Sequence, residues 1–149
     1  MCGIAGFVDF HCRSNESILH DMTFALAHRG PDDFGLHLCQ QGEAQIGFGH
    51  RRLSIIDLSP SGHQPMEFDQ LTIIFNGEIY NFAELKLELE KSGYSFISHS
   101  DTEVVLKAYH CWGKDAVHKF IGMFSIAIID HSKEKLVLIR DRAGIKPLY

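Results

Sequence analysis

Apolar and polar positions along the first half of the chain follow the periods of strands and helices in turn. Met1 to Asp9 is a short apolar segment with two glycines, which favours a buried strand over a helix. Residues 14–29 carry apolar side chains at helical spacing, and the pair at 30–31, Gly-Pro, supplies a stop signal. Residues 45–57 alternate and then become continuously apolar, which predicts a strand, and the turn-rich segment 59–65 predicts a loop.

The second half begins with a β-branched run, Leu71 to Phe75, which predicts a short strand. It runs into Asn76-Gly77, a dipeptide that favours positive φ, so we expect the strand to end there in a tight turn. Two amphipathic helices should follow. Asn81 caps the first, which ends at Gly93, and Ser100 or Asp101 caps the second.

The last part of the chain predicts a β-hairpin. Residues 123–130 and 135–140 are apolar strands, and the polar segment His131 to Glu134 joins them. Strands early, centrally and late, with helices between some and hairpins between others, indicate an α+β fold or a layered α/β/β/α domain. The end at Pro147-Leu148-Tyr149 follows a glycine-rich turn directly, so we expect the domain to be truncated on this side, with an exposed sheet edge.

Composition and charge exclude several partners. The 149 residues carry 14 basic and 19 acidic side chains, a formal net charge of -5, and the basic ones are scattered. A phosphate backbone or an anionic membrane surface needs clustered Lys and Arg, so we expect no nucleic acid and no membrane as partner. No apolar run approaches the roughly 20 residues needed to cross a bilayer. The length fits one domain, and we expect a cytoplasmic protein.

Cysteine and histidine spacing gives no metal site. The four cysteines form no Cys-x-x-Cys pair, so they are interpreted as reduced thiols, and the ten histidines show no two-His helical motif with a third ligand.

Cys2 directly follows the initiator methionine and precedes Gly3, a small pair from which Met1 can be removed. The mature chain would then begin with cysteine, whose thiol (pKa of about 8.5) and α-amine (pKa of about 8) share one residue. The amine would act as a built-in general base for the thiol. The alternative from position alone is an ordinary buried cysteine in the first strand.

The segment Cys-Gly-Ile-Ala-Gly-Phe at 2–7 resembles the start of class II glutamine amidotransferase domains. Further segments, in the same order as in the family, are similar to the glutamine-hydrolysing asparagine synthetases and span nearly the whole chain: His28–Asp32, Gly49–Asp57, Gly62–Met66, Asn76–Asn81, Ser100–Glu103 and Arg140–Tyr149. The resemblance implies an N-terminal-nucleophile hydrolase fold, an α/β/β/α sandwich with mainly antiparallel sheets. It also implies that residues 1–149 are a glutaminase domain, which we expect to be incomplete.

The same resemblance implies the site. Cys2 attacks the side-chain amide of glutamine, and the Asn76 side chain with the Gly77 backbone N–H holds the resulting oxyanion, for which fixed donors are needed. Arg52 and Asp101 would pair with the α-carboxylate and α-ammonium of glutamine. Three further positions are expected to touch glutamine: Leu53, Ile55 and Glu78.

Several residues have alternative interpretations. Asn-Gly alone is more typical of a hairpin turn, and Asp101 alone is equally typical of a helix cap. Arg51 and Arg52 are adjacent, so on a strand only one can point into the pocket, and the Arg-Leu-Ser pattern favours Arg52. We expect His50 and His63 not to be catalytic, because an N-terminal nucleophile already has its base. The motifs at 28–32 and 140–146 are expected to be structural or interdomain.

The resemblance also implies what this chain lacks. No phosphate-binding loop of the Ser-Gly-Gly-x-Asp-Ser or Walker type occurs, so ATP and Mg²⁺ are expected only for a synthetase domain absent from this chain, and no cofactor within it. Glutamine is the expected substrate, the synthetase domain or its chain is the expected ammonia acceptor, and the full-length protein would form a homodimer if it assembles at all. Two alternatives stay open: an amidotransferase serving another acceptor, and an inactive fragment with a binding or regulatory role.

Overall fold

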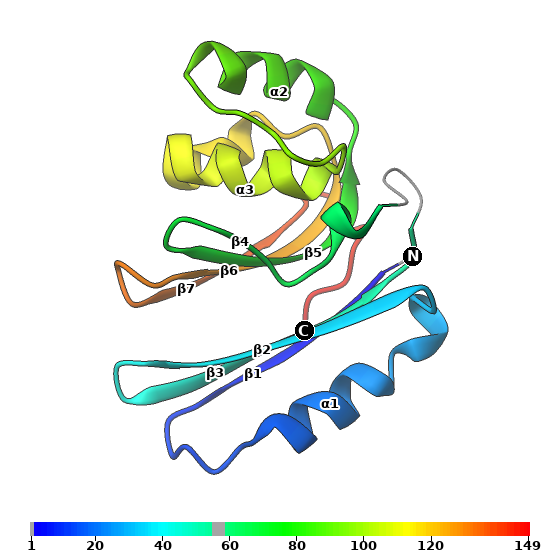
Figure 1. Cartoon of the computed structure of the whole chain (residues 1–149), viewed down its shortest axis with the longest axis vertical. Coiled ribbons are helices and arrows are strands. Elements are labelled where there is room, and N and C mark those ends of the chain that lie inside the picture. The colour runs from blue at the N-terminus through cyan, green and yellow to red at the C-terminus, as the bar shows by residue number, and fades with distance from the viewer. Residues whose placement is uncertain (1, 55–58) are drawn as a thin grey trace.

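Two antiparallel β-sheets lie face to face in the computed structural model, which describes residues 2–54 and 59–149 (Figure 1). The first sheet has the order β1-β3-β2, formed by Gly3–Asp9, Ala44–Arg52 and Asp33–Gln41. The second has the order β4-β5-β6-β7, formed by Met66–Phe68, Leu71–Ile79, Gly122–Asp130 and Lys135–Arg140. All strand pairs in both sheets are antiparallel.

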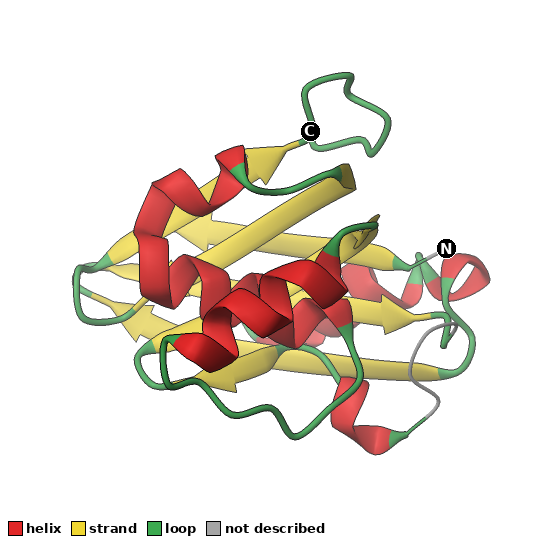
Figure 2. Ribbon diagram, turned by 90° about the horizontal axis from the view of Figure 1, so that it is seen from above, coloured by secondary structure: helices red, strands yellow, loops and turns green. Residues whose placement is uncertain are grey.

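Helices cover the two outer faces. The helix α1 (Glu16–Phe24) lies on the first sheet, and α2 (Phe82–Lys91) and α3 (Asp101–Trp112) lie on the second (Figure 1). Seen from above, helices cross over the strands (Figure 2). Short 3-10 turns occur at Ala27–Arg29, Pro60–Gly62 and Gly113–His118. The expected α/β/β/α order is therefore confirmed. Over the ranges that the structure describes, no helix is long and apolar enough to span a membrane.

The buried apolar side chains form two layers. The larger lies between the second sheet and the helices α2 and α3, where Leu89, Val105 and Ile126 are fully buried. The smaller lies between the sheets and joins Phe48 of β3 to Ile74 of β5. Alternation along β5 explains both layers, because successive side chains of a strand point to opposite faces of its sheet.

The hairpin of β6 and β7, the two helices α2 and α3, and the first strand agree with the pattern of the sequence. Ser100 caps α3, since its side chain accepts a hydrogen bond from the Thr102 N–H. Asn81 precedes α2 as predicted, but its side chain bonds Lys119 O and Ile121 N and makes no cap hydrogen bond to α2.

Other predicted boundaries were wrong. The helix expected over residues 14–29 is shorter and ends at Phe24. Beyond Phe24 the chain turns toward the start of β1, where Leu26 packs against Gly3 and Arg29 Nε donates to the Cys2 carbonyl. The strands β2 and β4 were missed. β2 lies at a sheet edge and alternates apolar and other residues only from Phe34 to Leu38, since Gln40 ends the apolar face, which leaves a short signal.

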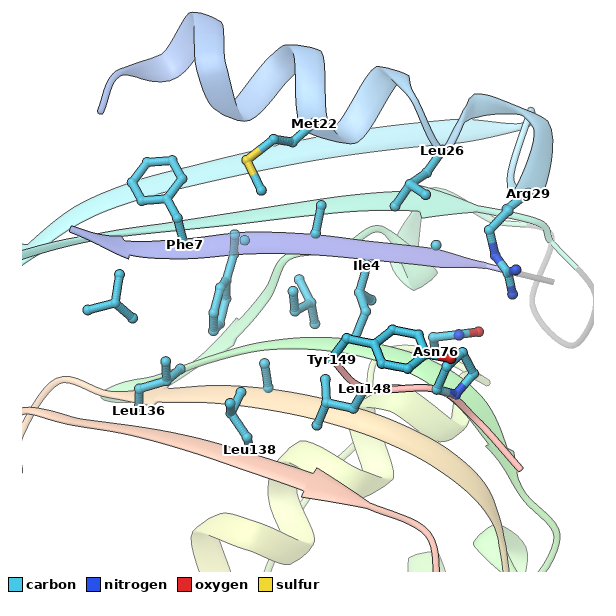
Figure 3. A pocket seen from close by; sticks show the side chains of 18 residues that line it. Ile4, Phe7, Met22, Leu26, Arg29, Asn76, Leu136, Leu138, Leu148 and Tyr149 are labelled. Carbon is cyan, nitrogen blue, oxygen red and sulfur yellow. The ribbon is translucent and has the colours of Figure 1, made fainter. Parts of the chain in front are cut away.

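A cavity of about 590 Å³ lies along β1 at one open side of the sandwich (Figure 3). Met22 and Leu26 of the α1 segment line it from one side of β1, and Leu136 and Leu138 of β7 line it from the other. β1 pairs only with β3, and β7 only with β6, among the strands that the structure describes. β1 and β7 are therefore edge strands, and Leu148 and Tyr149 also line the cavity between them. That the edge is exposed because the domain is truncated stays a prediction.

Candidate active site

The start of β1 and the end of β3 place Cys2 beside Arg52. Gly3 pairs with Arg51 across this ladder, so the next residue outward on each strand is Cys2 and Arg52. The second sheet contributes the distal half of β5, and α3 contributes its first turn. A cavity of about 100 Å³ at this junction is lined by Cys2, Arg52, Leu53, Gly62, Gln64, Phe75, Asn76, Gly77, Glu78, Ser100, Asp101, Thr102, Met123 and Lys146.

The Cys2 thiol is half-buried and held by backbone. Its Sγ accepts a hydrogen bond from the Leu53 N–H at 3.4 Å and lies 3.8 Å from the Leu53 carbonyl oxygen, which it can reach as a donor. The Cys2 carbonyl accepts from Arg29 Nε at 3.1 Å. These contacts fix both ends of the residue, so the sulfur faces the cavity from a defined position. Cys2 lies directly before the first residue of β1, Gly3.

Asn76 and Gly77 do not form a turn, and the prediction that the strand ends there was wrong. β5 continues to Ile79, with Asn76 paired to Ser125 and Gly77 to Phe124 of β6. A Cβ on Gly77 would lie 2.3 Å from the Met123 carbonyl oxygen, so only glycine lets β6 approach this closely. Pairing along the whole strand outweighs the local turn preference of the dipeptide.

The two arginines at the end of β3 face opposite ways, as expected. Arg51 Nε donates to the Gly30 carbonyl, and its guanidinium lies between the rings of Phe24 and Phe34. Arg52 lines the cavity, and its Nη1 donates to the Ser59 carbonyl at 2.9 Å. Arg51 therefore has a structural position, and Arg52 is the arginine that can meet a substrate carboxylate.

Asp101 lies at the first position of α3 and is almost fully buried. Its Oδ2 accepts from the Ile79 N–H at 3.1 Å, which ties the helix to the end of β5. Burial raises the pKa of Asp101 to about 6, the charge of Glu78 acts in the same direction, and hydrogen bonds from the Ile79 and Thr102 amides oppose the rise. Ser100 provides the cap, so the helix-cap interpretation of Asp101 was wrong and its carboxylate is available to the cavity it lines.

A buried ion pair holds the loop that leads to Asp101. The Glu103 carboxylate accepts hydrogen bonds from the Ile97 and Ser98 amides, from the Ser98 hydroxyl and from Lys107 Nζ. Burial alone would raise the pKa of Glu103, but the hydrogen bonds from Lys107 and Ser98 outweigh it and lower that pKa. Lys107 is itself 5% exposed and donates to the Ser95 carbonyl.

Neither histidine singled out in the sequence lines this cavity. His50 is fully buried, with Nε2 3.2 Å from the Phe75 carbonyl oxygen, and His63 Nδ1 lies 2.7 Å from an Asp33 carboxylate oxygen. That His50 and His63 take no part in catalysis stays a prediction. Across residues 2–54 and 59–149, no group of three or more His, Cys, Asp or Glu side chains is arranged to hold a metal ion.

The predicted residues Cys2, Asn76, Gly77, Arg52, Leu53, Glu78 and Asp101 all line one cavity. Ile55 lies outside the described residues. Sequence reasoning missed Gln64 and Lys146, which line the same cavity and are 4% and 2% exposed. Both lie in segments that resemble the family, but only the structure shows that their side chains are buried at the cavity.

Known proteins resemble this chain over its whole length. A family model described as a glutamine amidotransferase domain matches residues 1–149. The chain belongs to this family. It is 39% identical to a putative glutamine-hydrolysing asparagine synthetase 2 of Methanocaldococcus jannaschii and 44% identical to asparagine synthetase 2 of Bacillus subtilis, with the whole chain covered in both. It spans only 32% and 20% of the length of those two proteins.

Solved structures share the fold of the glutamine amidotransferase domain. A glutamine phosphoribosylpyrophosphate amidotransferase from Bacillus subtilis matches 98% of this chain and 38% of its own with a TM-score of 0.71 at 19% identity. A structure titled the allosteric regulatory enzyme of purine biosynthesis matches 97% of this chain and 38% of its own with a TM-score of 0.76 at 21% identity. The expectation of an α+β amidotransferase fold is confirmed.

We predict that Arg52→Lys raises the KM for glutamine by about 10- to 100-fold, because the ammonium group of lysine cannot form the bidentate hydrogen bonds that a guanidinium makes with a carboxylate. Steady-state glutaminase kinetics measure this. Arg13→Lys, on the exposed surface, is the matched control and should leave KM unchanged. An unchanged KM in folded Arg52→Lys protein would contradict the assignment.

Lys107→Met should lower the free energy of unfolding by about 3–5 kcal/mol, because it leaves the buried Glu103 carboxylate without its partner. Urea denaturation followed by circular dichroism measures the change. Lys119→Met is the control, since the Lys119–Glu88 pair is partly exposed and should contribute less than about 1 kcal/mol. Equal losses of unfolding free energy in the two variants would show that burial does not strengthen the Glu103–Lys107 pair.

Proposed function

We propose that this chain is the glutaminase part of a glutamine-hydrolysing asparagine synthetase. The observation that carries the proposal is the joint lining of one cavity by the Cys2 thiol, by Asn76 and Gly77 of β5, and by one cationic and one anionic side chain, Arg52 and Asp101. A nucleophile, two potential oxyanion donors and partners for both charged groups of an α-amino acid thus meet at one place. The match with synthetase relatives over the full chain supports the same function.

Acylation requires a chain that begins at Cys2. The free α-amine takes the thiol proton, and the sulfur attacks the carboxamide carbon of glutamine. The negative charge that develops on the carbonyl oxygen is stabilised by the Asn76 side-chain amide and the Gly77 N–H, donors held in place by the strand. Collapse of the adduct breaks the C–N bond, and the α-ammonium returns the proton to the leaving nitrogen, so ammonia departs and a γ-glutamyl thioester remains on Cys2.

Deacylation repeats the same steps with water. The α-amine accepts a proton from water as the water oxygen attacks the thioester carbon, and the same donors hold the second oxyanion. Cleavage of the C–S bond releases glutamate, and the sulfur recovers its proton from the α-ammonium. The sum is glutamine plus water giving glutamate plus ammonia, with no net change in the protein.

Recognition of free glutamine follows from its two backbone charges. The Arg52 guanidinium pairs with the α-carboxylate, and the Asp101 carboxylate pairs with the α-ammonium. Glu78, Leu53 and, outside the described residues, Ile55 would complete the contacts around the bound amino acid.

The ammonia serves the ATP-dependent amidation of aspartate to asparagine in a synthetase domain that this chain does not contain. We assign ATP and Mg²⁺ to that domain, no cofactor to the glutaminase step, and homodimer formation, if it occurs, to the full-length protein. A second acceptor remains a candidate, because the chain is also 36% identical to a protein named amidase chry2 of Gibberella zeae. Assay of the longer protein with aspartate and ATP distinguishes the two, since only a synthetase forms asparagine.

The direct test of the glutaminase is covalent labelling. Incubation of the Met1-free chain with a glutamine analogue that carries an electrophilic γ-carbon should give a single adduct on Cys2, which peptide mass spectrometry locates. Excess glutamine should block the reaction. Cys12, which is exposed, is the internal control and should stay unmodified at the same reagent concentration.

A folded, Met1-free chain that forms no adduct would contradict the proposal and favour an inactive fragment with a binding or regulatory role. Labelling of Cys2 and Cys12 at equal rates, without protection by glutamine, would show a reactive thiol but no glutamine site.

Binding of glutamine should weaken as the pH falls through about 6. Asp101 is ionised above the pKa of about 6 that burial gives it, and below that pH it loses the charge that attracts the α-ammonium. Calorimetry on the Cys2→Ala variant avoids the titration of the nucleophile, and we expect Kd to rise by about tenfold between pH 7 and pH 5. Asp101→Asn should bind weakly at both pH values. A pH-independent Kd in Cys2→Ala would exclude this role.

A further inference from the structure

The side of β5 that faces away from β6 is paired with a strand over only part of its length. The short strand β4 pairs with β5 from Leu71 to Ile73, and no described strand covers the edge beyond that point. In an antiparallel strand, alternate residues direct their N–H and C=O groups to the same side. Phe75, Gly77 and Ile79 therefore present backbone groups to this uncovered edge.

Side chains take the place of the missing strand at Phe75. Its N–H donates to Gln64 Oε1 at 2.7 Å, and its carbonyl oxygen lies 3.2 Å from His50 Nε2. At Ile79 the N–H donates to Asp101 Oδ2. Between them, the Gly77 N–H points by the same alternation toward the cavity that Cys2 lines. Both anchored residues thus flank the donor that the reaction needs.

His50 and Gln64 also connect this strand to the rest of the site. His50 lies on β3 two residues before Arg52, and Gln64 Nε2 donates to the hydroxyl of Thr102, the neighbour of Asp101 on α3. Both side chains are buried, with 0% and 4% exposure. Gln64 uses both ends of its amide, so any rotation of this side chain breaks two contacts at once.

The protonation of His50 is set by its partner. A carbonyl oxygen only accepts, so Nε2 carries the proton and donates to Phe75. Burial lowers the pKa of His50 to about 4, which keeps the ring neutral near pH 7. Its Nδ1 is buried and has no hydrogen-bond partner among the described residues. An apolar side chain would avoid that penalty, so the donor at Nε2 is what the imidazole contributes here.

We propose that His50 and Gln64 are positioning residues of the glutaminase. Gln64 holds the N–H of Phe75 and His50 holds its carbonyl oxygen, so that the Asn76 side-chain amide and the Gly77 N–H face the thiol of Cys2. Neither side chain is required to touch the substrate. The inference rests on the proposed function, and it agrees with a non-catalytic role for His50.

Matched variants of His50 test the donor. Gln places an amide nitrogen at the position of Nε2, whereas Asn places it one bond short. His50→Asn should lower kcat by about 10- to 100-fold while KM, set by Arg52 and Asp101, stays within about threefold, because displacement of preorganised donors affects the transition state rather than the bound substrate. His50→Gln should restore most of kcat. Gln64→Met, similar in volume but unable to hydrogen-bond, should match His50→Asn.

A purely structural role predicts a different result. If His50→Asn and Gln64→Met fold, as thermal unfolding shows, and kcat is unchanged or kcat and KM change together, the proposal is wrong. Equal kcat values for His50→Asn and His50→Gln would likewise overturn it. If Gln64→Met does not fold, the His50 pair carries the decision alone.

Amide hydrogen exchange provides a readout that is independent of turnover. In the wild-type chain the backbone N–H of Phe75 should be protected from exchange, and in Gln64→Met it should exchange faster. The backbone N–H of Asn76 points toward β6 and should exchange at the same rate in both proteins. If the wild-type chain shows neither turnover nor labelling of Cys2, the proposed glutaminase function fails, and exchange at Phe75 then decides separately whether Gln64 holds the Phe75 N–H. Unchanged protection in Gln64→Met would contradict the proposal whatever the activity.

Discussion

The uninterrupted pairing of β5 with β6 through Asn76-Gly77 is the constraint on which the site depends. This pairing sets the alternation of the backbone, so Phe75 and Ile79 turn their amides to the same edge as Gly77. At position 77 only glycine, which has no Cβ, lets β6 approach this closely. A turn here, which the dipeptide alone favours, would break this alternation and move Asn76 and Gly77 away from the cavity that Cys2 lines.

Each part of the site is held by another part. The Cys2 thiol is held by the backbone of Leu53, the residue after Arg52, and the Asp101 carboxylate by the end of β5. The hydrogen bonds that hold Cys2 and Asp101 at the cavity therefore also join the start of β1 to the end of β3 and α3 to β5. Disruption of one element should displace the neighbouring groups, which is why variants of equal volume are needed to separate function from folding.

Local pattern and family resemblance predicted much of the fold and the composition of the site. The helices beginning near Asn81 and Ser100 and the final hairpin carry strong periodicity. Strand alternation indicated that only one of Arg51 and Arg52 faces the pocket, and the Arg-Leu-Ser pattern of the family selected Arg52. The strand β2 was missed because its alternation of apolar residues covers only Phe34 to Leu38 before Gln40 ends the apolar face. Gln64 was missed for another reason: its role depends on contacts with Phe75 and Thr102, which are distant in sequence.

An N-terminal nucleophile needs a free Cys2 amine before catalysis can begin. Glutaminase rates are compared for the Met1-free chain and for the same chain with Met1 retained, each verified by intact mass. We expect turnover in the Met1-free chain and loss of turnover when Met1 remains, because a peptide nitrogen cannot accept the thiol proton. Equal rates in the two forms would contradict an N-terminal nucleophile.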